Sequence, residues 1–318
     1  MSRLAALFAF VAVAASLVGV ALATPGTITE FKVPPPGGPN GIAIGSDGAV
    51  WFTELARPAI GTRGKSGFRT FLLPNPASPY SIVGGPDGAL WFTEAYGTGI
   101  GRITTSGQIT EFAVPPCPSC GDSGGPLGIT VGSDGALWYT RPANSTLGRV
   151  GMDGHITEVQ LPGVASDASW ITTGRDGALW FTDETGVGRM GMDGSVSQVW
   201  SGLNYPSAIA TGPDGNLWVT GSSQDVVARV TPAGRAKVFA LDLNCDPQSV
   251  ASGAGALWVA CYNLDEIERV STTGAVTAFP VPSHLPNYPD VLSGIVKGPG
   301  GMWFTEYAGG RIGRIAVR

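Results

Sequence analysis

Charged side chains are scarce in this sequence, which limits the partners it can attract. Asp, Glu, Lys and Arg together make up 14% of its 318 residues, and the formal net charge is −5. A weakly charged, acidic chain has no basic surface for a phosphate backbone, so we expect no nucleic-acid partner. Long apolar runs are also missing after residue 23, where no stretch approaches the ~20 apolar residues of a membrane span.

The one long apolar run lies at the start of the sequence. Arg3 precedes an apolar stretch over residues 4–20, and Ala-Leu-Ala at 21–23 fits a small-residue cleavage site. This pattern predicts a secretory signal peptide over residues 1–23 and a single domain over residues 24–318, with an uncleaved anchor helix as the alternative. We therefore expect a secreted, extracytoplasmic monomer that has no membrane contact after cleavage.

Cysteine is rare as well, with four in the whole chain. An even number suits an oxidising compartment. Cys117 and Cys120 lie three residues apart in an expected loop, and Cys245 and Cys261 flank one expected hairpin. These positions predict two local disulfides, Cys117–Cys120 and Cys245–Cys261. A four-cysteine zinc site is the rival, and the wide separation of the two pairs disfavours it.

Glycine and proline, in contrast, are abundant, at 48 and 25 residues. The glycines recur in register with a tryptophan motif whose fullest form is "DGALWFTE". Seven copies follow one another at spacings of 38 to 47 residues, with their tryptophans at Trp51, Trp91, Trp138, Trp180, Trp218, Trp258 and Trp303. Such a period indicates a repeat architecture rather than low complexity. Only Trp170 and Trp200 fall outside this register.

Each copy contains four short apolar runs, which predict four strands. The first two runs are separated by Asp-Gly or Gly-Gly, a strong signal for a tight hairpin turn. Four strands about every 40 residues are typical of a β-propeller, so we predict an all-β fold with seven four-stranded blades. The last copy lacks a fourth run, and "TITEFKVP" over residues 27–34 is a spare one. We predict that this N-terminal strand closes the ring in the last blade and covers an open sheet edge.

One stretch resembles the nucleophile segment of chymotrypsin-like serine proteases. It reads "CGDSGGPLGI" over residues 120–129 and contains Ser123. In that protease class the histidine and aspartate precede the serine, whereas both histidines here, His155 and His284, follow it. "GPLGI" also occupies the position of "GPNGI" in the first copy, so we interpret it as the lead-in to the third blade. A protease is therefore not expected.

Chemistry is expected on one face of the propeller, which we call the channel face. Because strands alternate in direction, the loops leading into first strands and the ends of second strands meet there. The lead-in positions are Asn40, Tyr80, Leu127, Ser169, Ser207, Gln248 and Ser293. The second strands end at Glu54, Glu94, Arg141, Asp183, Gly221, Cys261 and Glu306. Of these we predict six ligand-binding residues: Asn40, Tyr80, Glu54, Glu94, Gln248 and Ser293.

Glu306, Glu54 and Glu94 belong to adjacent blades. Three carboxylates on one rim predict a site for a hard cation or a general base. The alternative is that this glutamate recurs because it hydrogen-bonds the backbone of the neighbouring blade. His284 lies in the loop before the seventh blade, within reach of Glu306, so we take both as catalytic candidates. His155 is expected on the opposite rim, in solvent.

The repeat resembles the streptogramin B lyase (virginiamycin B lyase) family over essentially the whole mature chain. The matching pattern is G-I-x-x-G-x-D-G-x-L-W-F-T-E followed by I-G-R-I-T. This resemblance implies a seven-bladed propeller that opens the lactone ester of a cyclic depsipeptide antibiotic by Mg²⁺-assisted elimination. The histidines that lead into blades six and seven in the family fall on Gln248 and Ser293. The glutamate that closes the last repeat is kept as Glu306.

Other family positions also differ. A family glutamate falls on Val291, with Asp290 beside it, and the first lead-in tyrosine falls on Asn40. We therefore expect a lyase-like propeller that binds a small molecule, peptide or glycan without the family's catalytic histidines. One alternative is an active lyase that uses His284, with Glu306 and Asp290 holding Mg²⁺. A cell-envelope interaction module and a gluconolactonase-type enzyme are further alternatives.

Overall fold

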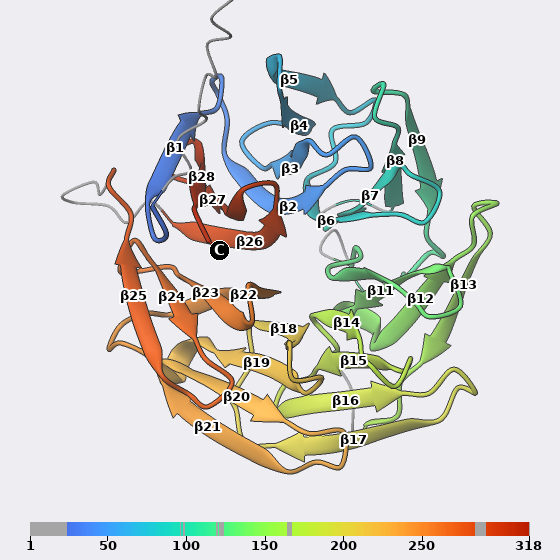
Figure 1. The fold of residues 1–318 in the computed structure, drawn as a ribbon. Coiled ribbons are helices and arrows are strands. Elements are labelled where there is room, and N and C mark those ends of the chain that lie inside the picture. The colour runs from blue at the N-terminus through green and yellow to red at the C-terminus, as the bar shows by residue number, and fades with distance from the viewer. Residues whose placement is uncertain are drawn as a thin grey trace, which may run out of the picture.

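Seven four-stranded antiparallel sheets are arranged around a common axis in the computed structural model (Figure 1). It describes residues 24–317 apart from residues 96, 98, 119, 121–123, 164–166 and 284–290. The expected signal peptide at residues 1–23 lies outside this part. Within it, none of the helices has the length and apolar character that crossing a membrane requires. The all-β, seven-bladed propeller predicted from the repeat is confirmed.

Blades one to six are each a meander in which four consecutive strands pair in sequence order. Blades one to three comprise β2 (Pro39–Ile44), β3 (Val50–Glu54), β4 (Ala59–Gly64), β5 (Gly67–Leu72); β6 (Pro79–Gly84), β7 (Leu90–Glu94), β8 (Gly99–Ile103), β9 (Ile109–Ala113); β10 (Ile129–Val131), β11 (Leu137–Arg141), β12 (Thr146–Val150), β13 (Ile156–Gln160). Blades four to six comprise β14 (Ile171–Thr173), β15 (Leu179–Thr182), β16 (Gly186–Met190), β17 (Val196–Ser201); β18 (Ala208–Thr211), β19 (Leu217–Gly221), β20 (Val226–Val230), β21 (Ala236–Ala240); β22 (Pro247–Gly253), β23 (Ala256–Cys261), β24 (Glu266–Val270), β25 (Val276–Pro280). Two short 3-10 helices, η2 (Pro142–Asn144) and η4 (Ser222–Gln224), follow the second strands of blades three and five.

Blade seven closes the ring with strands from both ends of the chain. It contains β26 (Leu292–Gly298), β27 (Gly301–Glu306) and β28 (Arg311–Ile315), and its fourth strand is β1 (Ile28–Lys32). β1 runs antiparallel to β28, with Ile28 opposite Ile315 and Lys32 opposite Arg311. The predicted closure by the N-terminal strand is confirmed, and it gives β28 a partner on its outer edge.

The second strand of each blade forms the core. In blade one, Trp51 is fully buried and packs against Ile82 and Phe92 of the next blade, so the repeated tryptophan fills the space between blades as expected. On the face opposite the channel face, the hairpin aspartate accepts a hydrogen bond from the tryptophan Nε1–H at 3.0–3.2 Å in blades one to five. We call this the turn face. These aspartates therefore fix the indole rings as well as forming turns.

A close approach between the second and third strands explains one glycine of the repeat. Gly101 of β8 lies opposite Phe92 of β7, and a Cβ atom on this glycine would lie 1.9 Å from the phenyl ring. The equivalent pairs in blades one, three, four and seven also join a glycine to an aromatic ring, at 1.9–2.3 Å for such a Cβ. In these five blades the ring therefore excludes any side chain at this position.

Candidate functional site

A cavity of about 300 Å³ opens on the channel face, where the first strands of all seven blades meet. Its floor is a ring of β-branched aliphatic side chains, one from each blade and each 6–8% exposed. They are Ile42, Ile82, Ile129, Ile171, Ile209, Val250 and Ile295. This position follows the lead-in residue by two in each repeat, so the repeat itself supplies an apolar floor.

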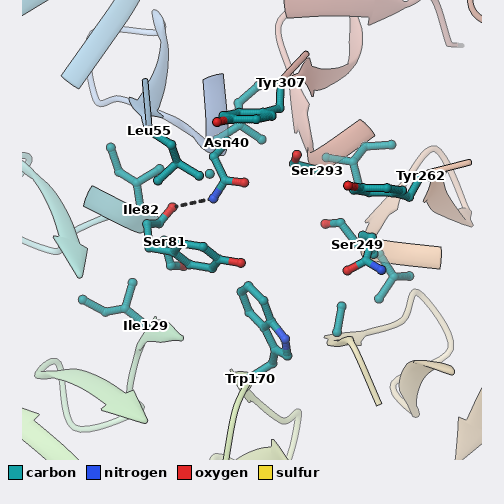
Figure 2. A pocket seen from close by; sticks show the side chains of 18 of the residues that line it. Asn40, Leu55, Ser81, Ile82, Ile129, Trp170, Ser249, Tyr262, Ser293 and Tyr307 are labelled. Atoms are coloured by element: carbon teal, nitrogen blue, oxygen red, sulfur yellow. Dashed lines mark hydrogen bonds between the residues drawn. The ribbon is translucent and has the colours of Figure 1, made fainter. Parts of the chain in front are cut away.

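Aromatic side chains form much of the wall above this floor. Tyr80 and Trp170 face each other across blades two and four, with ring centroids 6.0 Å apart. Tyr262 and Tyr307 follow the second strands of blades six and seven and line the same cavity. Figure 2 shows the rings of Trp170, Tyr262 and Tyr307 around the opening. Aromatic walls supply large contact areas for a ring-containing ligand.

Amide and hydroxyl groups supply the polar part of the wall. Asn40, Tyr80, Gln248 and Ser293 all line the cavity, so the structure brings these four predicted residues together. The Asn40 side chain donates to the Tyr80 carbonyl at 3.2 Å (Figure 2). Gln248 donates to the Asp246 carboxylate at 2.9 Å, and the Ser293 hydroxyl donates to the Val291 carbonyl at 3.2 Å. These contacts hold the polar groups at the rim in fixed orientations.

Among the described residues, the cavity lining contains no Asp, Glu, Lys, Arg or His. Its hydrogen-bonding groups are amides, serine hydroxyls, tyrosine hydroxyls and the backbone. An uncharged wall of this kind favours an uncharged ligand, because a charged ligand would lose its hydration without gaining a counter-charge. A second groove over blades three to five adjoins the cavity through Tyr80, Trp170 and Gln248, and there Asp167, Asp183 and Glu184 add negative charge.

The second-strand glutamates do not meet at the cavity. Glu54 and Glu306 are fully buried, Glu94 is 5% exposed, and none of the three lines the cavity. Glu54 accepts hydrogen bonds from Arg57 at 2.7 Å and Thr70 at 3.3 Å. Each of these carboxylates interacts with the third or fourth strand of its own blade: Glu54 with Thr70, Glu94 with Glu111, and Glu306 with Arg311. The expected cluster of three carboxylates on one rim is therefore wrong for the described structure.

Strand alternation explains the direction of these side chains. The threonine before the glutamate faces the next blade, as the tryptophan does, and Thr53 donates to the Tyr80 carbonyl at 2.8 Å. Thr305 of blade seven makes the same bond to the Asn40 carbonyl at 2.6 Å. The glutamate, one residue later, faces the opposite side of its sheet. The interblade backbone bond considered for the glutamate is therefore made by the threonine.

Glu94 occupies an unusual electrostatic position in blade two. Its Oε1 is buried without a hydrogen-bond partner among the described residues, and the Glu111 carboxylate lies nearby on β9. Burial, and then repulsion by Glu111, raise the pKa of Glu94 to about 7. In blade three the equivalent position is Arg141, which pairs with Glu158 at 3.2 Å. The same position thus carries opposite charges in adjacent blades.

Both predicted disulfides are present. Cys245 and Cys261 are joined at the channel-face end of blade six, with their Cα atoms 4.5 Å apart. Cys117 and Cys120 close a short loop, with their Cα atoms 5.4 Å apart. The rival four-cysteine zinc site is excluded by these pairings.

The lyase resemblance implies a bound Mg²⁺, and the described residues near the cavity do not fit one. Glu306 accepts a hydrogen bond from Ser283 at 3.1 Å and lies 3.7 Å from the Arg311 guanidinium, which already supplies a positive charge. Within the described part, groups of three candidate ligand residues occur only in blade six. Asp290, the other expected ligand, lies outside the described residues, as does His284.

Ser123 and His155 are the two remaining positions that the sequence singled out. Ser123 also lies outside the described residues, and the segment after it leads into β10 as expected, with the Leu127 N–H bonded to the Thr140 carbonyl at 2.9 Å. His155 is exposed in the turn between β12 and β13, on the turn face as predicted.

Three aromatic wall residues were not predicted from the sequence. Trp170 had a usable signal, because it falls outside the tryptophan register and directly follows a lead-in position. Tyr262 and Tyr307 directly follow second strands, a position that varies from blade to blade. A search for aromatic residues at that position would have found both.

Comparison with known proteins agrees with the geometry. The model of the virginiamycin B lyase family matches residues 26–203 and 196–318. The chain belongs to the virginiamycin B lyase family. The structure of virginiamycin B lyase from Staphylococcus aureus superimposes with a TM-score of 0.83 at 29% identity, covering 92% of this chain and 99% of that one. A catalytically inactive histidine-to-alanine variant of that enzyme, solved with quinupristin, superimposes equally well, with a TM-score of 0.83 and the same coverage.

A curated relative matches over a shorter stretch. The virginiamycin B lyase of Nocardia farcinica is 33% identical over 78 residues. That match spans 24% of this chain and 28% of the relative.

Proposed function

We propose that this protein is a secreted propeller that binds an uncharged, ring-containing small molecule or peptide in the channel-face cavity. The observation that carries the proposal is the cavity lining: an aliphatic floor, four aromatic rings, and amide and hydroxyl groups without a charged side chain among the described residues. A cavity of about 300 Å³ suits a ligand or a side group of modest size. The two disulfides support an oxidising, extracytoplasmic location.

We propose further that the protein lacks the elimination activity of its relatives. Elimination needs a base for the proton beside the carbonyl and an acid or metal at the ester oxygen. Gln248 and Ser293 occupy the lead-in positions where the family places histidines. An amide exchanges no proton near neutral pH, and a serine hydroxyl needs a base of its own. The wall residues therefore bind and orient a ligand without transferring its protons.

The test uses virginiamycin B, the cyclic depsipeptide antibiotic after which the matching family is named. We expect calorimetric titration to show binding and Trp170→Ala to weaken it by about tenfold, since aromatic anchors contribute over ~1 kcal/mol each. Trp200→Ala, on the outer strand β17, is the matched control and should leave the affinity unchanged. Two results together would contradict the proposed ligand class. They are no binding of this antibiotic at high concentration, and no effect of Trp170→Ala on the binding of any other neutral cyclic peptide tested.

The active-lyase alternative is examined in the same samples. Purified protein is incubated with virginiamycin B and Mg²⁺, and ring opening is followed by mass spectrometry. We expect little turnover, because each acid–base group typically contributes about 10²- to 10⁴-fold. Robust turnover that disappears in His284→Ala and Glu306→Gln would instead establish a lyase whose histidine lies in the loop before blade seven.

A further inference from the structure

Blade six departs from the other blades at the close approach between its second and third strands. In five blades a glycine lies under an aromatic ring at this point, and in blade five the pair is Val219 and Ala228. In blade six the pair is Val259 and Glu268. No aromatic ring lies on the second strand at this point, and the third strand carries a glutamate where five other blades have a glycine. Glu268 is fully buried, on the side of blade six that packs against blade five.

Two more carboxylates surround this buried one. Glu266 lies two residues earlier on β24 and therefore on the same face of the sheet. Asp242 lies in the loop between β21 and β22, and its N–H donates to Glu268 Oε1 at 2.9 Å. One carboxylate oxygen from each of Asp242, Glu266 and Glu268 lies within 4.8 Å of the other two. This separation equals about twice a Ca²⁺–oxygen distance of ~2.4 Å, so one ion can contact all three.

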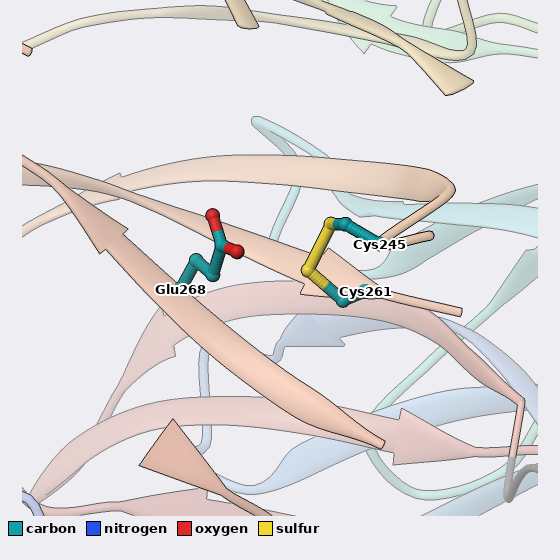
Figure 3. Close-up of side chains that lie close together, drawn as sticks. All are labelled: Cys245, Cys261 and Glu268. Atoms are coloured by element: carbon teal, nitrogen blue, oxygen red, sulfur yellow. A yellow bond between two sulfur atoms is a disulfide. The ribbon is translucent and has the colours of Figure 1, made fainter. Parts of the chain in front are cut away.

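The loop that carries Asp242 is anchored on both sides. Cys245 is bonded to Cys261 at the end of β23, and Figure 3 shows the Glu268 carboxylate beside this disulfide. The Asp225 carboxylate accepts the N–H groups of Asn244 and Asp246, each at 2.9 Å. A cation would therefore meet a preformed loop rather than have to order one.

The buried oxygens of this cluster lack a counter-charge. Glu268 Oε2 and Glu266 Oε1 are buried without a hydrogen-bond partner among the described residues. Within the same part of the chain, no Lys or Arg forms an ion pair with any of the three carboxylates. An unpaired buried carboxylate is costly to retain, and a cation would remove that cost.

We infer that Asp242, Glu266 and Glu268 bind a calcium ion between blades five and six, apart from the channel-face cavity. All three donors are hard oxygen ligands, which Ca²⁺ prefers. Asp242 is exposed, so water completes the coordination from the outer side. The disulfide leaves no thiolate for Zn²⁺, and Mg²⁺ demands a tighter octahedral site of waters and few carboxylates. The ion would join blades five and six by charge, at a position where five other blades have an aromatic ring packed on a glycine.

Calcium chloride titrated into the oxidised, chelator-treated protein tests this inference. Extracellular calcium modules bind with dissociation constants of about 10⁻⁴ to 10⁻³ M, so 10 mM Ca²⁺ should raise the Tm by about 3–6 °C. Glu268→Gln, which keeps the shape of the side chain, should abolish both the shift and the calorimetric heat. Asp242→Asn, on the exposed loop, should weaken binding about tenfold without touching the core. Equal stabilisation by 10 mM Mg²⁺ would overturn the assignment to calcium.

Glu94→Gln is the matched control. It removes another buried glutamate that also has a carboxylate oxygen without a partner among the described residues, in blade two. This variant should keep the full Ca²⁺-dependent shift, whatever its starting Tm. The inference fails if the unaltered protein shows neither heat nor shift at 10 mM Ca²⁺. It also fails if the shift persists in both Glu268→Gln and Asp242→Asn, because the ion would then bind elsewhere.

Discussion

The two faces of the propeller follow opposite rules. On the turn face the same contacts recur: blades one to five each hold a tryptophan Nε1–H on the hairpin aspartate, and blades two to five add an arginine to that carboxylate at 2.6–2.9 Å. On the channel face the seven lead-in positions carry five different residue types, with serine in three blades. The contacts that repeat from blade to blade thus stabilise the ring, and the side chains that vary line the cavity.

This difference separates residues that hold the ring from residues that meet a ligand. The aliphatic floor is the boundary between them, since it repeats like the turn face and yet lines the cavity. Substitutions on either side of that boundary should therefore have separable effects on stability and on binding.

The largest effect is expected from a pair of tryptophans, one on each side of the floor. Trp91 is fully buried, so Trp91→Ala should lower the free energy of unfolding by about 3–5 kcal/mol. Trp170 is only partly buried, and Trp170→Ala should cost about 1 kcal/mol while weakening ligand binding. Chemical denaturation of both variants measures this. Equal losses of stability would remove the distinction between the two faces.

A smaller effect is expected from the turn-face aspartate of blade two. Asp87 accepts hydrogen bonds from Trp91 at 3.1 Å and Arg102 at 2.6 Å. Burial alone would raise the pKa of Asp87, but these bonds hold it below its usual value. Asp87→Ala should therefore cost about 1–3 kcal/mol at pH 7. A pKa that is lower in the fold than in the unfolded chain stabilises the fold at pH values above the pKa of the unfolded chain. The difference in stability between Asp87→Ala and the unaltered protein should therefore shrink as the pH falls below about 4.

Denaturation at pH 7 and pH 3 checks this prediction, with Asp87→Asn as the control. The amide keeps an acceptor for the indole and loses only the charge, so it should cost less than Asp87→Ala at pH 7. A loss of stability that is the same at both pH values would mean that packing, rather than the carboxylate, accounts for it.

The smallest effect is a gain of stability from Glu94. Its pKa is raised to about 7 in the fold, so the unfolded chain loses this proton more readily, and stability falls as the pH rises from about 4.5 to 7. Glu94→Gln removes that cost and should stabilise the protein by about 1 kcal/mol at pH 8, with little change at pH 4.5. Thermal unfolding at the two pH values measures it. Destabilisation at pH 8 would show that Glu94 is paired in solution.

The sequence predicted the scaffold better than the site, and the reason lies in what repeats. The tryptophan motif predicted the blades, and the spare run at residues 27–34 predicted the closure that β1 makes with β28. The cysteine positions predicted both disulfides. Four lead-in residues were placed correctly in the cavity because their positions follow from strand direction.

The glutamates were misplaced because a position at a strand end does not give the direction of the side chain. Glu54 is two residues from Phe52 on the same strand, so the pleat places both side chains on the same side of the sheet. The Asp242, Glu266 and Glu268 cluster was missed for another reason. Its members lie in two different segments, the loop between blades five and six and strand β24, and come together only in the folded structure.

Ring closure has a kinetic consequence. The contact between Ile28 and Ile315 is the most non-local pairing in the molecule's strand ladders, so the first strand has no partner until the last one has been made. Six blades can assemble from local hairpins while β1 is still unpaired. Closing the ring then has the entropic cost of a loop of nearly the whole chain. A chain that emerges N-terminus first would therefore keep β1 unpaired until β28 has also emerged.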